Sequence, residues 1–360
     1  ELNATGPVSI GGSIVGDCMA VELSTADSLT VDGADVNTRC AVTPAPNEAP
    51  DLVFFAAGEV SVTGSELLSG GRVFVGNGVD DPTGGLDLGQ QSQIMASTPR
   101  RSDPTPMRCE FANTTVEAGE VATGGAGEGV LIWPNAAQVS CSGEASVETV
   151  ILRGGAGGDG PSKESTGVVQ ASGGEWGGRA LLQAGGPLTL AGRVELRGGD
   201  GGDGGAAIAT GSEFGGDATA VGGDGGWGGF ARVDAPSITV AEGSSLVLNF
   251  GVDGDGGDAT AIAGDGIGGG AGGRASATAG NGGWKAVTKD LSLLNRPGLA
   301  ILDGVIDETS LSRVRLGDIT AGSGGDAMAS GGRGGDGFEP GQSGGVGGAA
   351  SAVGLSLIHI

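Results

Sequence analysis

Short runs in which apolar and polar residues alternate recur along the first part of the chain. Alternation with a period of two is typical of β-strands buried on one face, and no segment carries the sustained 3.6-residue apolar period of a helix. A polar, proline-rich stretch over residues 80–108 predicts an exposed loop between these runs. We therefore predict an all-β fold. The clearest alternating runs are residues 7–10, 19–23, 28–31, 52–55, 59–62 and 72–75.

One nine-residue motif occurs twice in the chain, each time at the end of an apolar run. It reads LRGGAGGDG at residues 152–160 and LRGGDGGDG at residues 196–204. It belongs to a larger repeat in which three short strands precede a glycine-rich excursion. The strands are assigned to residues 130–133, 138–140 and 147–152 in the first copy, 180–184, 188–190 and 193–196 in the second, 230–234, 237–240 and 245–249 in the third, and 285–288, 291–294 and 299–302 in the fourth.

Three strands within about 20 residues match one coil of a parallel β-helix, whose stacked coils share a continuous apolar interior. We therefore expect a right-handed parallel β-helix. Residues 1–120 would form its cysteine-containing, β-rich N-terminal part, and residues 121–354 its glycine-rich repeats.

The excursions repeat the triplet Gly-Gly-x, which matches the three residues per turn of a polyproline II helix. Residues 198–205 are expected to run outward, residues 210–213 to turn, and residues 215–227 to return; residues 257–262 and 325–329 are also assigned to returns. Ordering glycine costs much backbone entropy, so these segments need hydrogen bonds to one another. We predict stacked polyglycine-II-type helices with Asp, Arg and Trp pointing outward.

Three tryptophans, Trp176, Trp227 and Trp284, each close an excursion. We interpret them as a ladder that caps the apolar end of each coil. A stripe for stacking on carbohydrate is the alternative.

Composition limits the partners. The chain has 360 residues with 80 Gly and a formal net charge of −25, so phosphate backbones and anionic membranes are not expected partners. No stretch approaches the ~18 consecutive apolar residues of a membrane span, and no membrane insertion is expected in this segment.

The cysteines are Cys18, Cys40, Cys109 and Cys141. An even count without metal-site spacing favours two disulfides in an oxidising compartment. The simplest pairing is Cys18 with Cys40 and Cys109 with Cys141, one of three pairings, and four buried reduced thiols are the alternative.

The last six residues, LSLIHI at 355–360, interrupt a small-residue pattern and read as the translation of a sequencing-adapter end. We expect the natural sequence to stop near Gly354 and its true end to be missing. His359 is the one histidine, so the natural part would lack Ser-His and Cys-His nucleophile pairs and histidine metal sites. We therefore predict no catalytic residues and no metal ligands.

Calcium is the one cofactor alternative, because the nonapeptide Gly-Gly-x-Gly-x-Asp-x-U-x, with U a large apolar residue, binds this ion between stacked turns. Residues 331–339 fit every position, whereas 154–162 and 198–206 carry Pro161 and Gly205 at the apolar position. Such matches are tandem in true arrays and scattered here, so solvated aspartates are the preferred interpretation and no cofactor is expected.

Two other functions remain as alternatives. A β-helix polysaccharide lyase or glycosidase needs clustered carboxylates or a basic residue on one face. The strand acids Glu195 and Asp234 do not recur at one register. The chain's lysines are Lys163, Lys285 and Lys289. An ice-binding protein needs ranks of threonine, and Thr219, Thr260 and Thr278 look isolated in the sequence.

With these strand triplets and Gly-Gly-Asp-Gly-Gly excursions, residues 120–354 resemble glycine-rich repeat proteins exported by environmental bacteria. The excursions alone resemble the polyglycine helix bundles of phage tail-fibre adhesins and of some arthropod antifreeze proteins. The resemblance implies an extracellular or cell-surface protein with a structural or adhesive role, and carbohydrate or other surface proteins as partners. It transfers no binding residue to this chain.

Overall fold

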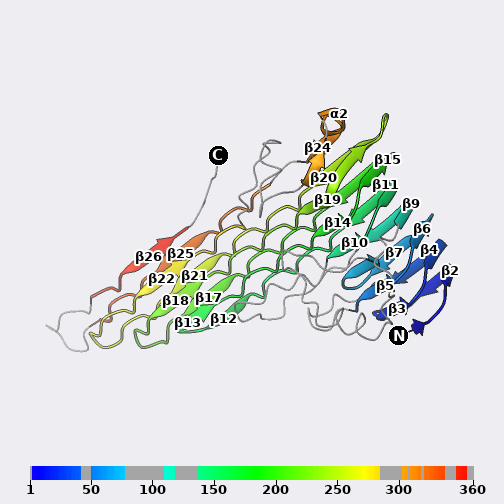
Figure 1. Ribbon diagram of the computed structural model, residues 1–360. Helices are drawn as coiled ribbons and strands as arrows, with labels where there is room; N and C mark the ends of the chain where they lie inside the picture. Colours follow the sequence, from blue (N-terminus) through cyan, green and yellow to red (C-terminus); the bar gives the residue numbers. More distant parts are fainter. Residues whose placement is uncertain are drawn as a thin grey trace.

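Parallel β-sheets make up most of the structure. The computed structural model describes residues 2–41, 50–77, 109–117, 136–283, 302–306, 308–317, 320–336 and 346–354. Within these residues the one helix is the short α2 (Glu308–Leu311), and neighbouring strands pair in parallel. The all-β prediction is confirmed, and the parallel sheets place the fold in a β-solenoid-like class (Figure 1).

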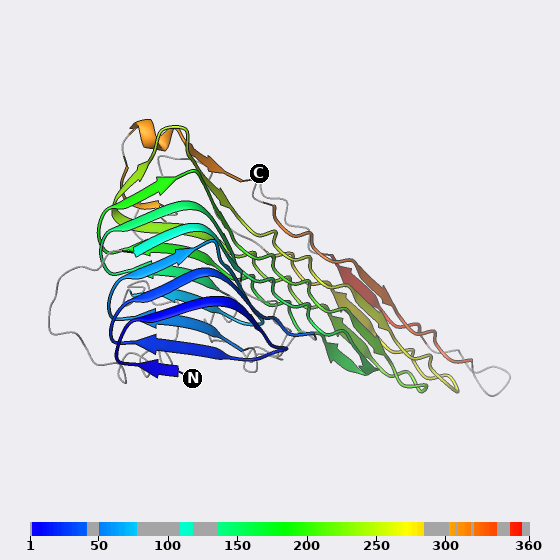
Figure 2. The same ribbon diagram turned by 90° about the vertical axis from the view of Figure 1, so that its right-hand side faces the viewer.

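The solenoid consists of coils stacked so that their strands form three columns, visible as the layered ribbons in Figure 2. The first column contains β1 (Leu2–Ala4), β3 (Val21–Thr25), β5 (Leu52–Ala56), β8 (Val73–Gly76), β10 (Ala137–Cys141), β14 (Ala180–Ala184), the first half of β19 (Ala231–Val240) and the start of β23 (Leu302–Ile306).

The second column contains the first half of β2 (Val8–Val15), of β4 (Leu29–Thr38), of β9 (Cys109–Glu117) and of β11 (Ala145–Arg153), with β6 (Val60–Thr63), β15 (Leu188–Ala191) and the second half of β19. The third column contains the second halves of β2, β4, β9 and β11, with β7 (Glu66–Ser69), β16 (Arg193–Arg197), β20 (Ser245–Asn249) and β24 (Val314–Leu316).

A coil without an insertion takes 21 residues, because Leu2 pairs with Leu23 and Leu52 pairs with Val73. Inward side chains at equivalent positions stack into aliphatic ladders that exclude water. Each buried Leu or Val contributes ~1.5–3 kcal/mol relative to exposure. One such ladder in the third column is Val36, Leu67, Val116, Leu152, Leu196 and Leu248.

In several coils the corner between the second and third columns is a single residue in the left-handed region, whereas residues 241–244 form a turn between β19 and β20. Gly33, Gly64 and Gly192 have φ values of 58°, 58° and 63° there, and the equivalent Thr149 has a φ of 51°. A side chain is disfavoured in this conformation, so glycine is the residue that bends the chain most cheaply.

The strand assignments of the second and third sequence copies are confirmed by β14, β15, β16, β19 and β20. Those of the first and fourth copies are wrong by one strand. Residues 138–140 lie in the first column, because β10 pairs with β14, and Leu302 pairs with Val233 of that same column. The strands of residues 130–133, 285–288 and 291–294 lie outside the described residues. The apolar runs of the three columns look alike in sequence, so the sequence does not show which column a given run joins.

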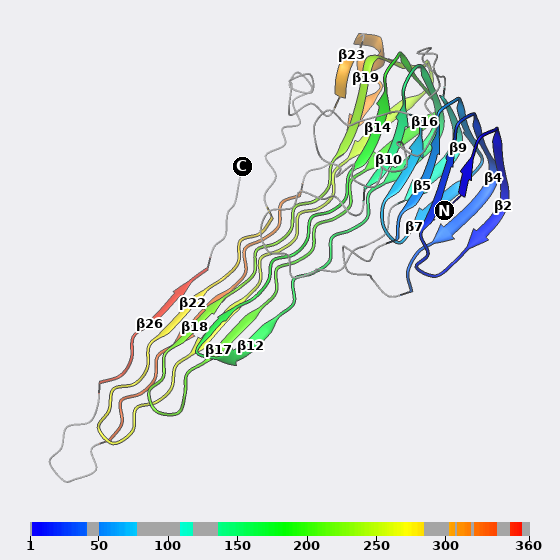
Figure 3. The ribbon, with the colours of Figure 1, turned by 60° about the horizontal axis from the view of Figure 1, so that its bottom comes forward.

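A glycine-rich insert projects from one corner of the solenoid as a long two-layer slab (Figures 1 and 3). In the described chain it has four rows, each with an outgoing and a returning segment: row one is residues 154–179, row two 198–230, row three 250–283, and row four 320–336 with 346–354. The outgoing layer includes β12 (Lys163–Thr166), β17 (Ala207–Thr210), β21 (Ala259–Ile262) and β25 (Ala327–Ser330). The returning layer includes β13 (Val168–Gln170), β18 (Ala218–Val221), β22 (Ala275–Thr278) and β26 (Ala350–Val353).

Backbone hydrogen bonds join the half of the slab nearest the solenoid, with a period of three residues. The N–H groups of Gly154, Gly157 and Gly160 donate to the carbonyls of Arg197, Asp200 and Asp203 in the next row, at 2.9, 2.8 and 2.7 Å. Other glycines bond between layers: Gly202 donates to Glu175 at 2.9 Å and Gly226 donates to Gly202 at 2.7 Å. The predicted hydrogen bonding between neighbouring excursions is thus confirmed.

The outer half of the slab changes to β-strands with alanine at every second position. Ala207, Ala209, Ala218 and Ala220 are buried between the layers, and they form a core cluster with Ala259, Ala261, Ala275 and Ala277. The layers therefore meet through methyl groups here and through bare glycine backbone near the solenoid.

The assignment of residues 257–262 and 325–329 to returning segments is wrong. β21 and β25 pair with β17 in the outgoing layer. The phrase Gly-Asp-Ala-x-Ala occurs in both directions because both layers turn alanine toward the same shared interior.

The close packing of the slab predicts that a side chain at an interlayer glycine strongly lowers the free energy of unfolding. A Cβ on Gly202 would overlap the Gly158 carbonyl oxygen, whereas a Cβ on Gly6 would meet nothing within 4 Å. We expect Gly202→Ala to lower the free energy of unfolding by ~2 kcal/mol or more through overpacking, and Gly6→Ala to change it by less than ~0.5 kcal/mol. Urea unfolding of both variants measures this; equal effects would contradict the packing.

Candidate functional surfaces

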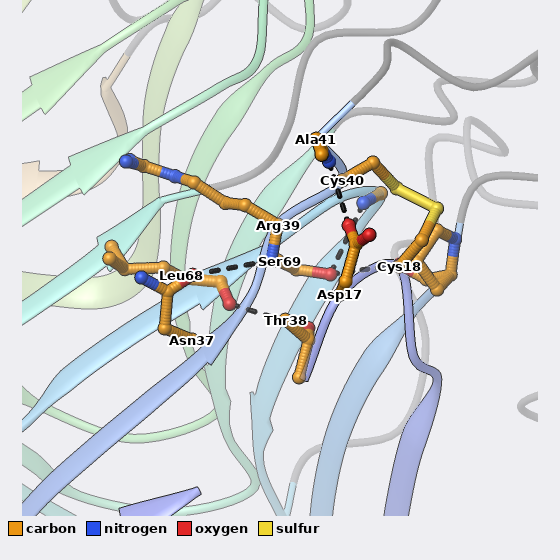
Figure 4. The surroundings of a disulfide bond; sticks show 11 residues. Asp17, Cys18, Asn37, Thr38, Arg39, Cys40, Ala41, Leu68 and Ser69 are labelled. Carbon is orange, nitrogen blue, oxygen red and sulfur yellow. Dashed lines mark hydrogen bonds between the residues drawn. A yellow bond between two sulfur atoms is a disulfide. The ribbon is translucent and has the colours of Figure 1, made fainter. Parts of the chain in front are cut away.

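The Cys18–Cys40 disulfide closes the first solenoid coils. The two residues lie 22 positions apart with their Cα atoms 4.2 Å from each other, and the bond confirms the predicted pair (Figure 4). Beside it, the Asp17 carboxylate accepts a hydrogen bond from the Ala41 N–H at 2.7 Å. The bridge and this bond hold the segment after β4 against the turn after β2.

The second predicted pair, Cys109 with Cys141, stays a prediction. Cys141 lies in the buried core at the end of β10, and the side chain of Cys109 lies outside the described residues. No free thiol occurs among the cysteines that the structure describes.

The aspartates of the Gly-Gly-Asp triplets form ladders across the rows. Asp159 Oδ1 accepts from the backbone N–H of Asp203 at 2.9 Å, Asp203 Oδ1 accepts from Asp255 at 2.8 Å, and Asp255 Oδ1 accepts from Ser323 at 2.6 Å. The same bond recurs from Val252 to Asp200, Arg274 to Asp217, Asn281 to Asp224, Asp326 to Asp258 and Arg333 to Asp265. Each aspartate thus satisfies a surface N–H of the row stacked on it.

This role was missed from the sequence. The available signal was the recurrence of Asp at the register of the next copy, as in Asp159, Asp203 and Asp255. This hydrogen-bonding role also concerns the calcium alternative, because Asp159 and Asp203 occupy the acid position of the two imperfect nonapeptides. In the structure each of these carboxylates accepts a backbone N–H of the next row. No cluster of three or more metal-ligating side chains occurs among the described residues. Phe338 of the best nonapeptide lies outside them.

Two of the three tryptophans form the predicted ladder. The rings of Trp176 and Trp227 are stacked with centroids 4.9 Å apart and planes 2° apart, on the returning layer near the solenoid. One face of each ring is therefore covered by the other ring, and Trp227 is 44% exposed. Trp284 lies outside the described residues. Burial of the neighbouring Glu175 raises the pKa of its carboxyl above its usual value.

The strand carboxylates of the solenoid are held in local ion pairs. Glu195 in the third column bonds Arg193 at 2.8 Å, and Asp234 in the first column bonds Arg232 at 3.3 Å. The structure does not bring Glu195 and Asp234 together on one strand column. Lys163 lies on β12, in the insert, and Lys285 and Lys289 lie outside the described residues.

Large apolar side chains gather on the outer half of the outgoing face. Ile208, Ile262 and Met328 come from three adjacent rows and are 38%, 46% and 60% exposed. We call these residues the distal apolar patch. Aspartates that accept backbone N–H groups lie on both sides of it along the outgoing layer: Asp203 and Asp255 before these strands, and Asp265 after β21.

The opposite, returning face carries two ranks of residues in register, and most of these residues are small. The first rank is Val168, Thr219, Ser276 and Ser351, and the second is Gln170, Val221, Thr278 and Val353. Thr219 and Thr278, which look isolated in the sequence, are therefore aligned with neighbours in adjacent rows. Thr260 lies on the other layer, between Ile208 and Met328.

A search for membrane-spanning segments among the described residues found no helix with the length and apolarity needed to cross a bilayer.

The aspartate ladders predict that the side-chain oxygen of Asp203, as a hydrogen-bond acceptor, contributes to stability. Removing the acceptor in Asp203→Ala should lower the free energy of unfolding by ~1 kcal/mol, the net value of one hydrogen bond, whereas Asp203→Asn keeps an oxygen acceptor and should cost less. Thermal melting of both variants measures this. A calcium-dependent rise in melting temperature that Asp203→Asn abolishes would instead show that this carboxylate binds the ion.

Comparisons of the chain with known proteins assign it to no family. No family model matches it, and no curated protein matches it. Among solved structures it is similar to the springtail antifreeze protein from Granisotoma rainieri, described as a nine polyproline type II helical bundle, with 20% identity over 48% of this chain and 87% of that chain. The TM-score of 0.15 is too low for this likeness to support a conclusion on fold or function.

Proposed function

We propose that the chain is a non-catalytic structural or adhesive protein that acts outside the cell or on a bacterial cell surface. A right-handed parallel β-helix is the body of this protein, and the insert is its rigid projection. The exported location implied by the resemblance to glycine-rich repeat proteins is part of this proposal. The Cys18–Cys40 disulfide is compatible with it.

The observation that carries the proposal is the distal apolar patch on the projecting slab. Ile208, Ile262 and Met328 are exposed although the slab interior beneath them is filled by alanine. A cluster of exposed apolar side chains is typical of a contact surface. The strands that carry it, β17, β21 and β25, lie in the projecting slab, away from the solenoid (Figure 1).

Binding to polysaccharides and cells tests this role. The full chain should be retained on an insoluble polysaccharide or on intact bacteria, and Ile262→Lys should weaken retention about tenfold, or ~1.4 kcal/mol. Val15→Lys is the matched control, because Val15 is an exposed valine on β2 of the solenoid. Retention that Ile262→Lys leaves unchanged would contradict the patch, and release of reducing ends would favour the lyase or glycosidase alternative.

Ice binding is a second candidate, favoured by the ranks on the returning face. Thr219, Ser276 and Ser351 present hydroxyls from successive strands of a parallel sheet. Neighbouring positions lie ~4.8 Å apart across the strands and ~6.7 Å apart along them. A flat, regular array of small side chains is the surface that ice binding requires.

Thermal hysteresis tests this candidate. If the array binds ice, Ser276→Lys should abolish hysteresis by placing a long charged side chain in its middle. Thr260→Lys, on the opposite layer, should leave hysteresis unchanged. An unmodified chain without hysteresis would remove ice binding as a candidate.

A further inference from the structure

The outgoing face of the slab is continuous with the outer face of the third column. Each outgoing row starts directly from a third-column strand, as Gly198 follows Arg197 at the end of β16. Arg197 Nη2 lies 3.5 Å from Oδ2 of Asp200, the acid of the first triplet in that row. The strand end and the third positions of the row therefore present their side chains to the same side. This surface runs along the side of the stack, so coils added to either end of the stack would extend it and leave it uncovered.

One rank of this surface consists of hydrogen-bond donors. Arg153 pairs with Arg197, and Arg197 pairs with Asn249, so successive strands place these three residues ~4.8 Å apart. Arg153 is exposed, and the side chain of Arg197 is 50% exposed. Asn249 donates one hydrogen of Nδ2 to Glu195 Oε1 at 3.2 Å and carries a second hydrogen on that nitrogen. We call Arg153, Arg197 and Asn249 the donor rank.

A rank of carboxylates lies farther along the same rows. Six residues beyond each member of the donor rank stand Asp159, Asp203 and Asp255, in rows one, two and three. All three are exposed, and Oδ1 of each accepts a backbone N–H of the next row, which fixes the carboxylate in place. A carboxylate has about four lone-pair sites, so it can accept further hydrogen bonds. We call these aspartates the acceptor rank; at ~3.1 Å per residue it lies ~19 Å from the donor rank.

A two-fold axis parallel to the stack, midway between the two ranks, matches them level by level. Such an axis preserves the order of the rows, so row one of one copy faces row one of the other. The donor rank of each copy then lies opposite the acceptor rank of the other copy, with Arg153 facing Asp159, Arg197 facing Asp203, and Asn249 facing Asp255. The surface is thus complementary to itself, as the contact in a two-fold symmetric dimer must be.

The residues midway between the ranks suit a position on the axis. They are Ala156, Asp200 and Val252, each three residues beyond a member of the donor rank. Val252 is 43% exposed, and contact with its own copy removes this apolar surface from water. Asp200 faces its own copy as well, and the neighbouring Arg197 compensates its charge. The axis therefore brings no uncompensated like charges together.

We propose that the chain pairs with a second copy of itself through this surface, as a two-fold symmetric dimer in which each donor rank binds the acceptor rank of the other chain. Arginine and carboxylate form charge-assisted hydrogen bonds, which are the strong ones. The net charge of −25 repels two copies at long range, but physiological salt screens exposed charges beyond ~8 Å, so the facing ranks decide. This pairing goes beyond the role proposed above and does not depend on it.

Charge reversal in the full chain tests the pairing, with sedimentation velocity as the measurement. Arg197→Asp places a carboxylate opposite Asp203 at two symmetric points, and Asp203→Arg places a guanidinium opposite Arg197. Each variant alone should raise the Kd of the dimer at least ~10-fold, because facing like charges repel. An equimolar mixture of the two variants should associate again, because both contacts of the mixed dimer then join opposite charges.

Matched controls make the same charge changes on the returning layer. Arg274→Asp and Asp224→Arg should each alter the Kd less than ~2-fold, although Asp224→Arg also removes a hydrogen bond between rows. Circular dichroism of Arg197→Asp verifies its fold, which does not depend on a bond between rows from this side chain.

Four outcomes would overturn the proposal. They are a native chain that stays monomeric at every protein concentration, a dimer that Arg197→Asp leaves unchanged, a mixture of the two reversed variants that stays monomeric, and a monomeric native chain that binds polygalacturonate through Arg197. The last outcome would identify an acidic polysaccharide as the occupant of the donor rank.

Discussion

The close approach of backbones inside the slab is the constraint on which the insert depends. Interlayer glycines such as Gly202, Gly226 and Gly254 have a neighbouring carbonyl oxygen where a Cβ would be. Only glycine permits that distance, and only that distance allows N–H groups to reach carbonyls both in the next row and in the other layer. Two of three positions are thereby fixed as glycine, and the third is left for a side chain that faces outward.

Such a slab has little hydrophobic stabilisation of its own near the solenoid. Each hydrogen bond contributes a net ~0.5–1.5 kcal/mol, while ordering one residue's backbone costs ~1–2 kcal/mol and glycine costs the most. The solenoid offsets this deficit by holding the ends of the rows. Its aliphatic ladders fix Leu152, Leu196 and Leu248 in one column, and the outgoing rows start from these stacked strands in matching register. The apolar core thus sets the row spacing that the glycines need.

The side chains at the third positions divide into two groups. Near the solenoid, aspartates such as Asp203 are used within the slab, because their oxygens accept the surface N–H groups of the next row. In the outer half, where alanine fills the interior, Ile208, Ile262 and Met328 are exposed and available for contacts. The aspartates of the glycine triplets are therefore structural, and the exposed apolar side chains lie at the less repetitive positions.

The sequence by itself determined the β-class, the coil of about 20 residues and the three-residue period of the insert, since alternation, spacing and glycine content are local properties. It favoured the Cys18–Cys40 pair as one of three pairings, and the structure decided for it. It placed the second and third copies correctly and the first and fourth wrongly, because apolar runs such as 138–140 look alike in every column. Only the tertiary structure decided which segments lie side by side. It showed that Asp159, Asp203 and Asp255 cap one another's rows and that Thr219 and Ser276 are aligned. These are relations between residues 44 to 57 positions apart, and the stacking of coils and rows, which sets those separations, depends on insert lengths that carry no local signal.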